Sequence, residues 1–246
     1  MDYEQLITEV GIQPLQLYLG LAMGLAFGIG ATLSNFCLRK MVLDLSVLRF
    51  SSASYTWLFG LGIAIVFTQL LLQGDTGDIS EAQVITAQTS LSGPIIGGLM
   101  FGFGMILSRG CASRQIIQLA SGNLRAILTL VTFAISAQLV YGGQLVPLRQ
   151  SVQDLWRLNQ SSTQLHEWLP LSQSHYLVIG LVITATCAVM LIKGRAWPQL
   201  LGAGIVGLAV ALGWYATSFI AYHSFNAMLP QSITFSAPAA QSLISV

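Results

Sequence analysis

The amino-acid sequence predicts an all-α fold, a polytopic membrane helical bundle with about six spans. Of the 246 residues, 54% are hydrophobic and only 8% are charged, whereas soluble domains carry about 25% charged residues. Six stretches of the chain lack charged residues and are long enough for a membrane helix of about 20 residues. A bilayer explains this composition, because side chains that face lipid can be apolar.

The uncharged stretches set the expected spans. The third span is short for a full crossing if it ends before Arg109, and Pro94 fits its first turn. We interpret the polar segment 147–174 as a surface connector, with a short amphipathic helix around Val152–Leu158 as the alternative. The expected spans are 15–35, 55–73, 94–108, 126–145, 175–192 and 199–220.

Basic residues orient these spans. If the N-terminus lies outside, the inner loops hold eight of the ten basic residues and the outer segments hold eight of the nine acidic ones. Because cytoplasmic loops are enriched in Lys and Arg, we expect the N-terminus to lie on the outer side of the membrane. The net charge is only +1, which provides no basic field for nucleic acid.

Two segments of the chain repeat one another. Residues 24–37 (GLAFGIGATLSNFC) align without a gap with residues 98–111 (GLMFGFGMILSRGC), and eight of the fourteen positions are identical. We therefore expect repeat units at about 15–73 and 94–146 within a single membrane domain, residues 1–246. Transporter folds commonly contain such repeats, with the substrate site at the repeat interface.

The repeat contains glycines and one cysteine per copy. We expect Gly24, Gly28, Gly98 and Gly102 to let neighbouring helices approach closely in lipid. Close packing would not require a matching cysteine, so the cysteines call for a separate explanation.

A short, less apolar segment follows each repeated cysteine. The residues Ser113–Leu119 are predicted to form a helix of about two turns that stops at Ser121-Gly122-Asn123. Short helices after Cys37 and Cys111 suit re-entrant half-helices, whose N-terminal N–H groups favour an anion. The alternative is a cytoplasmic interfacial helix after an ordinary span.

The three cysteines differ in their surroundings. Cys187 lies in the middle of a span and is expected to be a small buried apolar residue. Nearby cations would lower the pKa of Cys37 and Cys111, whereas a bound anion would favour the neutral thiol, and the sequence leaves both open. The candidate substrate-binding residues are Cys37, Cys111, Gly110, Arg109, Arg114 and Gln115.

No enzyme signature stands out in the sequence. CxxC and Cys/His metal spacings are absent, and so are a Ser/His/Asp pattern, a phosphate loop and an ATPase signature. We therefore expect no metal, no cofactor and no enzymatic activity. The expected spans also contain no acidic residue, which weakens a proton relay through carboxylates.

The segments SRGCASRQIIQLASGNLRAI (108–127), FCLRKMVLDLSVLRF (36–50) and PQSITFSAP (230–238) carry a resemblance. In them the chain resembles the YeeE/YedE membrane family, also called the sulphur transport domain family. The resemblance implies thiosulfate import through an hourglass-shaped protein with a narrow cysteine-lined pathway, where thiols form transient hydrogen bonds to the anion. It implicates Cys37 and Cys111 in that pathway.

The chain departs from the family in one respect. Full-length members continue into a second half whose Gly-Cys block supplies a third pathway cysteine, whereas no cysteine follows Ala196 here. We expect a half-length member, a fragment or a chain truncated at the C-terminus. Such a chain would need a second half or an identical copy to enclose a pathway.

Three functions follow from these observations. The first is uptake of a small sulfur-containing anion, most simply thiosulfate, across the bacterial inner membrane, with the N-terminus in the periplasm. The second is a sulfane-sulfur relay, in which cysteine persulfides pass sulfur to a cytoplasmic sulfur-carrier protein. The third is a structural membrane subunit whose cysteines are incidental.

Overall fold

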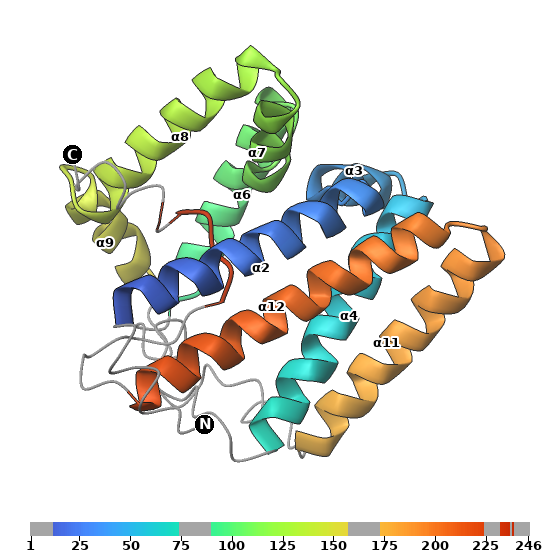
Figure 1. Cartoon of the computed structure of the whole chain (residues 1–246). Helices are drawn as coiled ribbons and strands as arrows, with labels where there is room; N and C mark the ends of the chain where they lie inside the picture. The colour runs from blue at the N-terminus through green and yellow to red at the C-terminus, as the bar shows by residue number, and fades with distance from the viewer. Residues whose placement is uncertain (1–11, 74–89, 157–172, 224–231, 237, 239–246) are drawn as a thin grey trace. The chain divides into compact units, whose positions relative to one another are not determined.

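The chain is all-helical in the computed structural model, which describes residues 12–73, 90–156, 173–223, 232–236 and 238 (Figure 1). No β-sheet occurs in these residues, and the predicted all-α class is confirmed. The helices are α2 (Ile12–Ser34), α3 (Leu38–Ser46), α4 (Ser52–Gln73), α6 (Ser92–Leu107), α7 (Ala112–Ala120), α8 (Leu124–Tyr141), α9 (Val146–Asp154), α11 (Gln173–Lys193) and α12 (Trp197–His223).

Six apolar windows in these helices are long enough to cross a membrane, as the sequence predicts, and the protein is a multi-pass membrane protein. The helices that carry them end within four residues of the expected positions. One window, Ser92–Ala120, contains α6, a break and α7. Large apolar side chains such as Leu99 and Leu128 are more than 70% exposed, which suits contact with lipid.

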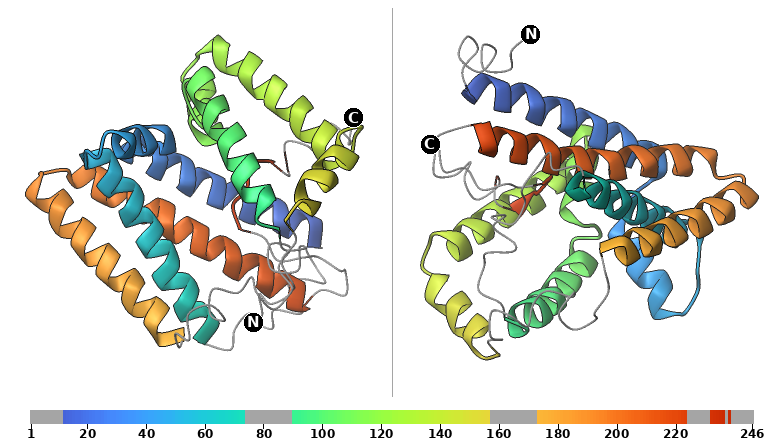
Figure 2. Two further views of the ribbon diagram at one scale, coloured as in Figure 1. Left: turned by 180° about the vertical axis from the view of Figure 1, so that it is seen from behind. Right: turned by 90° about the horizontal axis from the view of Figure 1, so that it is seen from below.

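The described helices fall into two compact units. The first unit comprises residues 1–36, 50–87 and 172–233, and its described helices are α2, α4, α11 and α12. Helix α12 packs against α2 and α4, and α4 packs against α11 (Figures 1 and 2). Cys187 is 5% exposed in a core with Phe59, Leu191 and Ala203, so it is buried as the sequence predicts.

Two glycine contacts hold the first unit together. A Cβ atom added at Gly202 of α12 would lie 2.5 Å from the carbonyl oxygen of Gly30 in α2. One added at Gly207 would lie 2.5 Å from the carbonyl oxygen of Gly60 in α4. The absence of side chains therefore lets α12 approach both helices at backbone distance.

The close-packing glycines differ from those expected. No described atom lies within 4 Å of a Cβ added at Gly24, Gly28, Gly98 or Gly102, so that expectation is wrong for this structure. The cause is the helix face: residues two apart are turned by about 200° around an α-helix. Gly30 therefore meets α12 while Gly28 points away from it.

The second unit comprises residues 37–49, 88–171 and 234–246, with α3, α6, α7, α8 and α9. Helix α7 packs against α8, and α6 packs against α9, where the Ser92 hydroxyl donates a 2.5 Å hydrogen bond to the Val152 carbonyl oxygen. Helix α9 begins with Pro147 in its first turn, so the connector after α8 is helical from Val146. Helix α9 therefore begins before the short helix that we considered around Val152–Leu158 and overlaps only its first residues, because it ends at Asp154.

The glycine contact between α2 and α12 makes a stability prediction. Gly202→Ala should destabilise the protein by about 1–3 kcal/mol, because the added methyl group overlaps backbone atoms of Gly30 and Ser34. Thermal unfolding of the purified protein in detergent would measure this. The matched control is Gly98→Ala, which fills open space and should be neutral or stabilising by up to about 1 kcal/mol. Equal melting temperatures for the two variants would contradict the assignment of Gly202 as the close contact between α2 and α12.

Candidate functional site

Two helices end in turns of the same local geometry. Asn35 after α2 and Arg109 after α6 both have left-handed backbones, with φ of 50° and 57°. The Ser34 hydroxyl donates to the Gly30 carbonyl oxygen at 2.7 Å. The Ser108 hydroxyl donates in the same way to the carbonyl oxygen of Gly104, at 2.8 Å. Each residue of the first turn has its counterpart in the second turn 74 residues later, which is the offset of the sequence repeat.

The chain restarts a helix directly after each turn. Cys37 is the N-cap residue of α3 and Cys111 is the N-cap residue of α7, both with extended backbones, and both helices have nine residues. The expected short helix after Cys111 is confirmed, one residue longer at each end than Ser113–Leu119. Neither cysteine forms a regular side-chain capping hydrogen bond, so the first N–H groups of both helices meet at most a sulfur atom, which is a weak acceptor.

The two short helices also end alike. Leu48 after α3 and Gly122 after α7 have positive φ values of 51° and 84°. Their N–H groups donate to the carbonyl oxygens of Leu45 and Leu119 at 3.0 and 2.9 Å. The stop predicted around Gly122 is therefore present. In α3 the same left-handed position is occupied by a leucine, which adopts it less readily than glycine.

Both thiols lie in the second unit, where they interact with each other. The Cys111 sulfur lies 3.2 Å from the Ser113 hydroxyl oxygen. It also interacts with the backbone N–H groups of Leu38, the first residue of α3, and Arg114 in α7. The N-termini of both short helices thus converge on the cysteine pair, so their partial positive charges add at this place.

The cysteine pair determines the protonation of Cys37, which lies between the first two apolar windows. The interaction with Cys111, assisted by burial, raises the pKa of the Cys37 thiol, although the backbone N–H groups of Lys40 and Arg39 oppose the rise. Of the two protonation states that the sequence leaves open, the structure favours the neutral thiol at Cys37.

A buried glutamine holds the turn in front of Cys111. Gln115 is 3% exposed, and its Nε2 donates a 2.6 Å hydrogen bond to the Ser108 carbonyl oxygen. The Ser108 hydroxyl also donates to the carbonyl oxygen of Gly110 at 2.8 Å. A Cβ atom added at Gly110 would lie 3.1 Å from Gln115 Nε2, so the turn packs tightly against α7. Gln115 and Gly110 therefore shape the cysteine loop.

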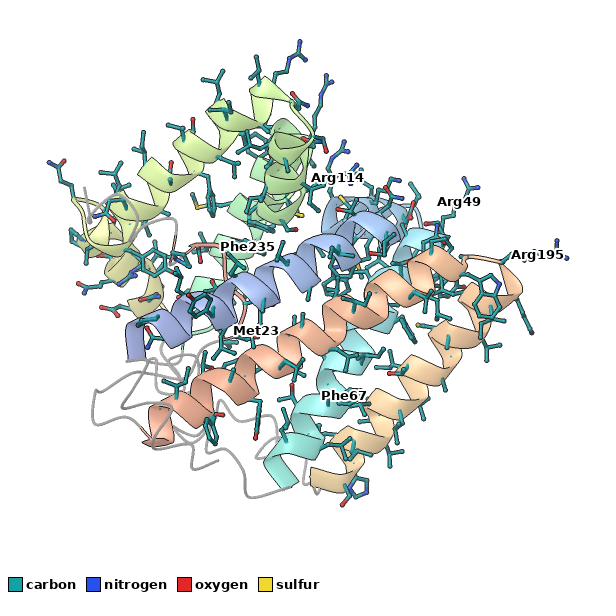
Figure 3. All side chains as sticks on the ribbon, in the orientation of Figure 1. Met23, Arg49, Phe67, Arg114, Arg195 and Phe235 are labelled. Atoms are coloured by element: carbon teal, nitrogen blue, oxygen red, sulfur yellow. The ribbon has the colours of Figure 1, made fainter. Side chains whose placement is uncertain are left out.

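The cations expected at the site differ in position. Arg114 is half-buried on α7, next to Gly110 (Figure 3). Arg109 is exposed in the left-handed turn. The sequence did not single out Arg39, which follows Cys37 by two residues. The guanidinium Nε of Arg39 is buried. Charge matching across the repeat did not single out Arg39, because its counterpart 74 residues later is Ser113.

A cavity of about 680 Å³ adjoins Cys111 between α6, α7 and α8. Its wall is mainly apolar and includes Met105, Phe133 and the buried Gln115. Hydroxyl groups of Thr129 and Thr132 also line it, and both donate to carbonyl oxygens of their own helix. Within the described ranges, no group of three His, Cys, Asp or Glu side chains gathers to hold a metal ion.

Two comparisons with known proteins show what this chain is similar to. The model of the Sulphur transport family matches residues 33–245, which include both short helices and both cysteines. The thiosulfate transporter TsuA of Spirochaeta thermophila is 28% identical to this chain over 127 residues. That stretch covers 52% of this chain and 37% of the relative, so the chain aligns with little more than a third of the relative's length.

The raised pKa of Cys37 predicts its reactivity. Maleimides react with the thiolate, so alkylation of Cys37 should be slow at neutral pH and should rise only above pH 8.5, where about half of a free cysteine is ionised. Peptide mapping by mass spectrometry after timed alkylation of the full chain would give this profile. Cys111→Ala removes the main cause and should move the profile back towards lower pH. A wild-type Cys37 profile at or below that of free cysteine would contradict the prediction.

Proposed function

Because this chain belongs to the Sulphur transport family, a family of transporters and not of enzymes, we propose that it carries a small sulfur-containing anion, most simply thiosulfate, through a site at Cys37 and Cys111. The observation that supports the proposal best is the convergence of two helix N-termini on a pair of facing thiols. The relative's name as a thiosulfate transporter supports the choice of anion.

The chemistry of such an anion suits the site. Its oxygen atoms accept hydrogen bonds, and uncapped N–H groups at a helix N-terminus are donors that favour negative charge. A neutral thiol adds a weak S–H donor. A thiolate would repel a single negative charge about 4 Å away by about 4 kcal/mol at an effective dielectric constant of about 20. The raised pKa of Cys37 avoids this repulsion at that residue.

Weak donors also suit passage. A conducting site must bind an ion well enough to admit it and weakly enough to release it. Thiols and backbone N–H groups, with no metal or paired cations required, meet both conditions. Binding at Cys37 and Cys111 would replace part of the anion's hydration shell without trapping it.

We further propose that α3 and α7 are re-entrant half-helices. Nine residues of α-helix measure about 14 Å, less than half of a hydrocarbon core about 30 Å thick. Polar N–H groups at the helix starts are tolerated at membrane depth where they line a water-filled cavity. The excess of basic residues in the loops that we expect to be cytoplasmic supports a periplasmic N-terminus and transport inwards.

Further protein would complete the pathway. Only 6% of the Leu124–Tyr141 span is buried, although α8 carries hydroxyl groups into the cavity beside Cys111. Hydroxyl groups are better matched by protein or water than by lipid. We propose that a second half of a longer chain, or a second copy of this chain, covers this face.

The alternative function is a sulfur relay, which the facing thiols also suit. In that step a cysteine thiolate attacks the outer sulfur of thiosulfate and the S–S bond of the anion breaks. Sulfite leaves, and the cysteine persulfide remains for a cytoplasmic carrier protein to accept. The step needs a thiolate, which the raised pKa of Cys37 disfavours at that residue.

Removal of one thiol tests transport. We expect Cys111→Ala to reduce thiosulfate uptake at least about tenfold in cells without other importers, because loss of a donor to a charged group costs about 1.5–3 kcal/mol. Cys187→Ala is the matched control, because Cys187 is a free cysteine of the other unit, and it should leave uptake unchanged. Normal uptake by a well-expressed Cys37/Cys111 double alanine variant would refute the proposal.

Mass spectrometry separates transport from relay. After the purified protein is exposed to thiosulfate, transport predicts unmodified thiols at Cys37 and Cys111. A relay predicts a mass increase of one sulfur atom on one of them, with sulfite released in equal amount. A stable persulfide would therefore replace the transport proposal with the relay.

A further inference from the structure

Arg39 has an unusual environment in the second unit. It is the second residue of α3, and its side chain is half-buried. The guanidinium Nε is buried and has no hydrogen-bond partner among the described residues.

An unpaired buried guanidinium N–H is unfavourable. The Nε–H loses its hydrogen bond to water and gains none from the protein, and the penalty is larger for a charged group than for a neutral one. Arginine also stays protonated in proteins, so the charge cannot be removed by a shift of the pKa. An anionic ligand with oxygen acceptors would supply the missing partner.

The position of Arg39 connects it to the cysteine pair. Its backbone N–H interacts with the Cys37 sulfur, so the backbone of Arg39 lies where the N-termini of the two short helices converge. The neighbouring residue Leu38 directs its N–H to the Cys111 sulfur. Arg39 therefore belongs to the same short stretch of α3 that touches both thiols.

The two short helices are not equivalent at this position. Ser113, the counterpart of Arg39 in α7, places a neutral hydroxyl 3.2 Å from the Cys111 sulfur. Arg39 adds a permanent positive charge on the α3 side. The repeat thus has a hydroxyl beside the thiols at this position of α7 and a cation at the same position of α3.

From these observations we propose that Arg39 is a binding residue, whose Nε–H donates to an oxygen of the anion and whose charge makes the site prefer dianions to monoanions. This inference rests on the proposed function, since it concerns the same site. Arginine suits the role because its N–H groups point in fixed directions, whereas a lysine ammonium is a flexible point charge.

Anion binding to the purified full chain, measured by titration calorimetry, tests the inference. Thiosulfate is the dianion and thiocyanate is the sulfur-containing monoanion. Arg39→Gln should raise the Kd for thiosulfate about tenfold or more, a change of about 1.4 kcal/mol, and should raise the Kd for thiocyanate much less. Arg39→Lys keeps the charge but loses the Nε–H, and should still weaken thiosulfate binding.

Arg49→Gln is the matched control. It removes the same charge three residues after the end of α3, where the side chain is exposed (Figure 3), and it should change the Kd for thiosulfate less than twofold. If Arg39→Gln does not fold, Arg39→Lys decides the question alone. Wild-type affinity in the Arg39 variants, or an equal loss for both anions, would overturn the inference. Failure of the wild-type chain to bind or transport thiosulfate would instead refute the proposed function.

Discussion

The need of every backbone polar group for a partner is the constraint on which this structure depends. A membrane helix meets it internally, and a break in the helix exposes N–H groups that must find other partners. This chain breaks its helices after Ser34 and Leu107 and restarts them at Cys37 and Cys111. The exposed N–H groups therefore meet at two thiols. Sulfur is a weak hydrogen-bond acceptor, so these N–H groups can still bind a stronger acceptor.

The supports of the site are local, and they differ between the two breaks. The turn before Cys111 is held by the Gln115 amide and by the second hydrogen bond of Ser108. The counterpart of Gln115 in the first segment is Met41, which has no amide to offer. One short helix therefore has a turn held by a glutamine before its cysteine, and the other has Arg39 where α7 has Ser113. Such divergence within a repeated pattern lets two similar helices hold one asymmetric ligand.

Much of this arrangement is predictable from sequence, because local signals determine it. Charge-free windows locate the spans, and the matching cysteines with their following polar segments locate the short helices. Long-range contacts are less accessible. Gly28 and Gly30 look alike in the sequence, yet only the face of α2 that meets α12 makes Gly30 the contact residue. Arg39 was missed because its importance lies in a buried nitrogen without a partner, which no spacing reveals.

The protonated state of Cys37 also bears on how readily this residue is oxidised. The thiolate is the form of cysteine that attacks peroxides and disulfides, so a thiol that holds its proton reacts slowly with both. A disulfide between the two facing cysteines would tie the starts of α3 and α7 together and remove the S–H donor of Cys37. The contact that keeps Cys37 neutral thus slows the oxidation of this residue, which stays available as a hydrogen-bond donor.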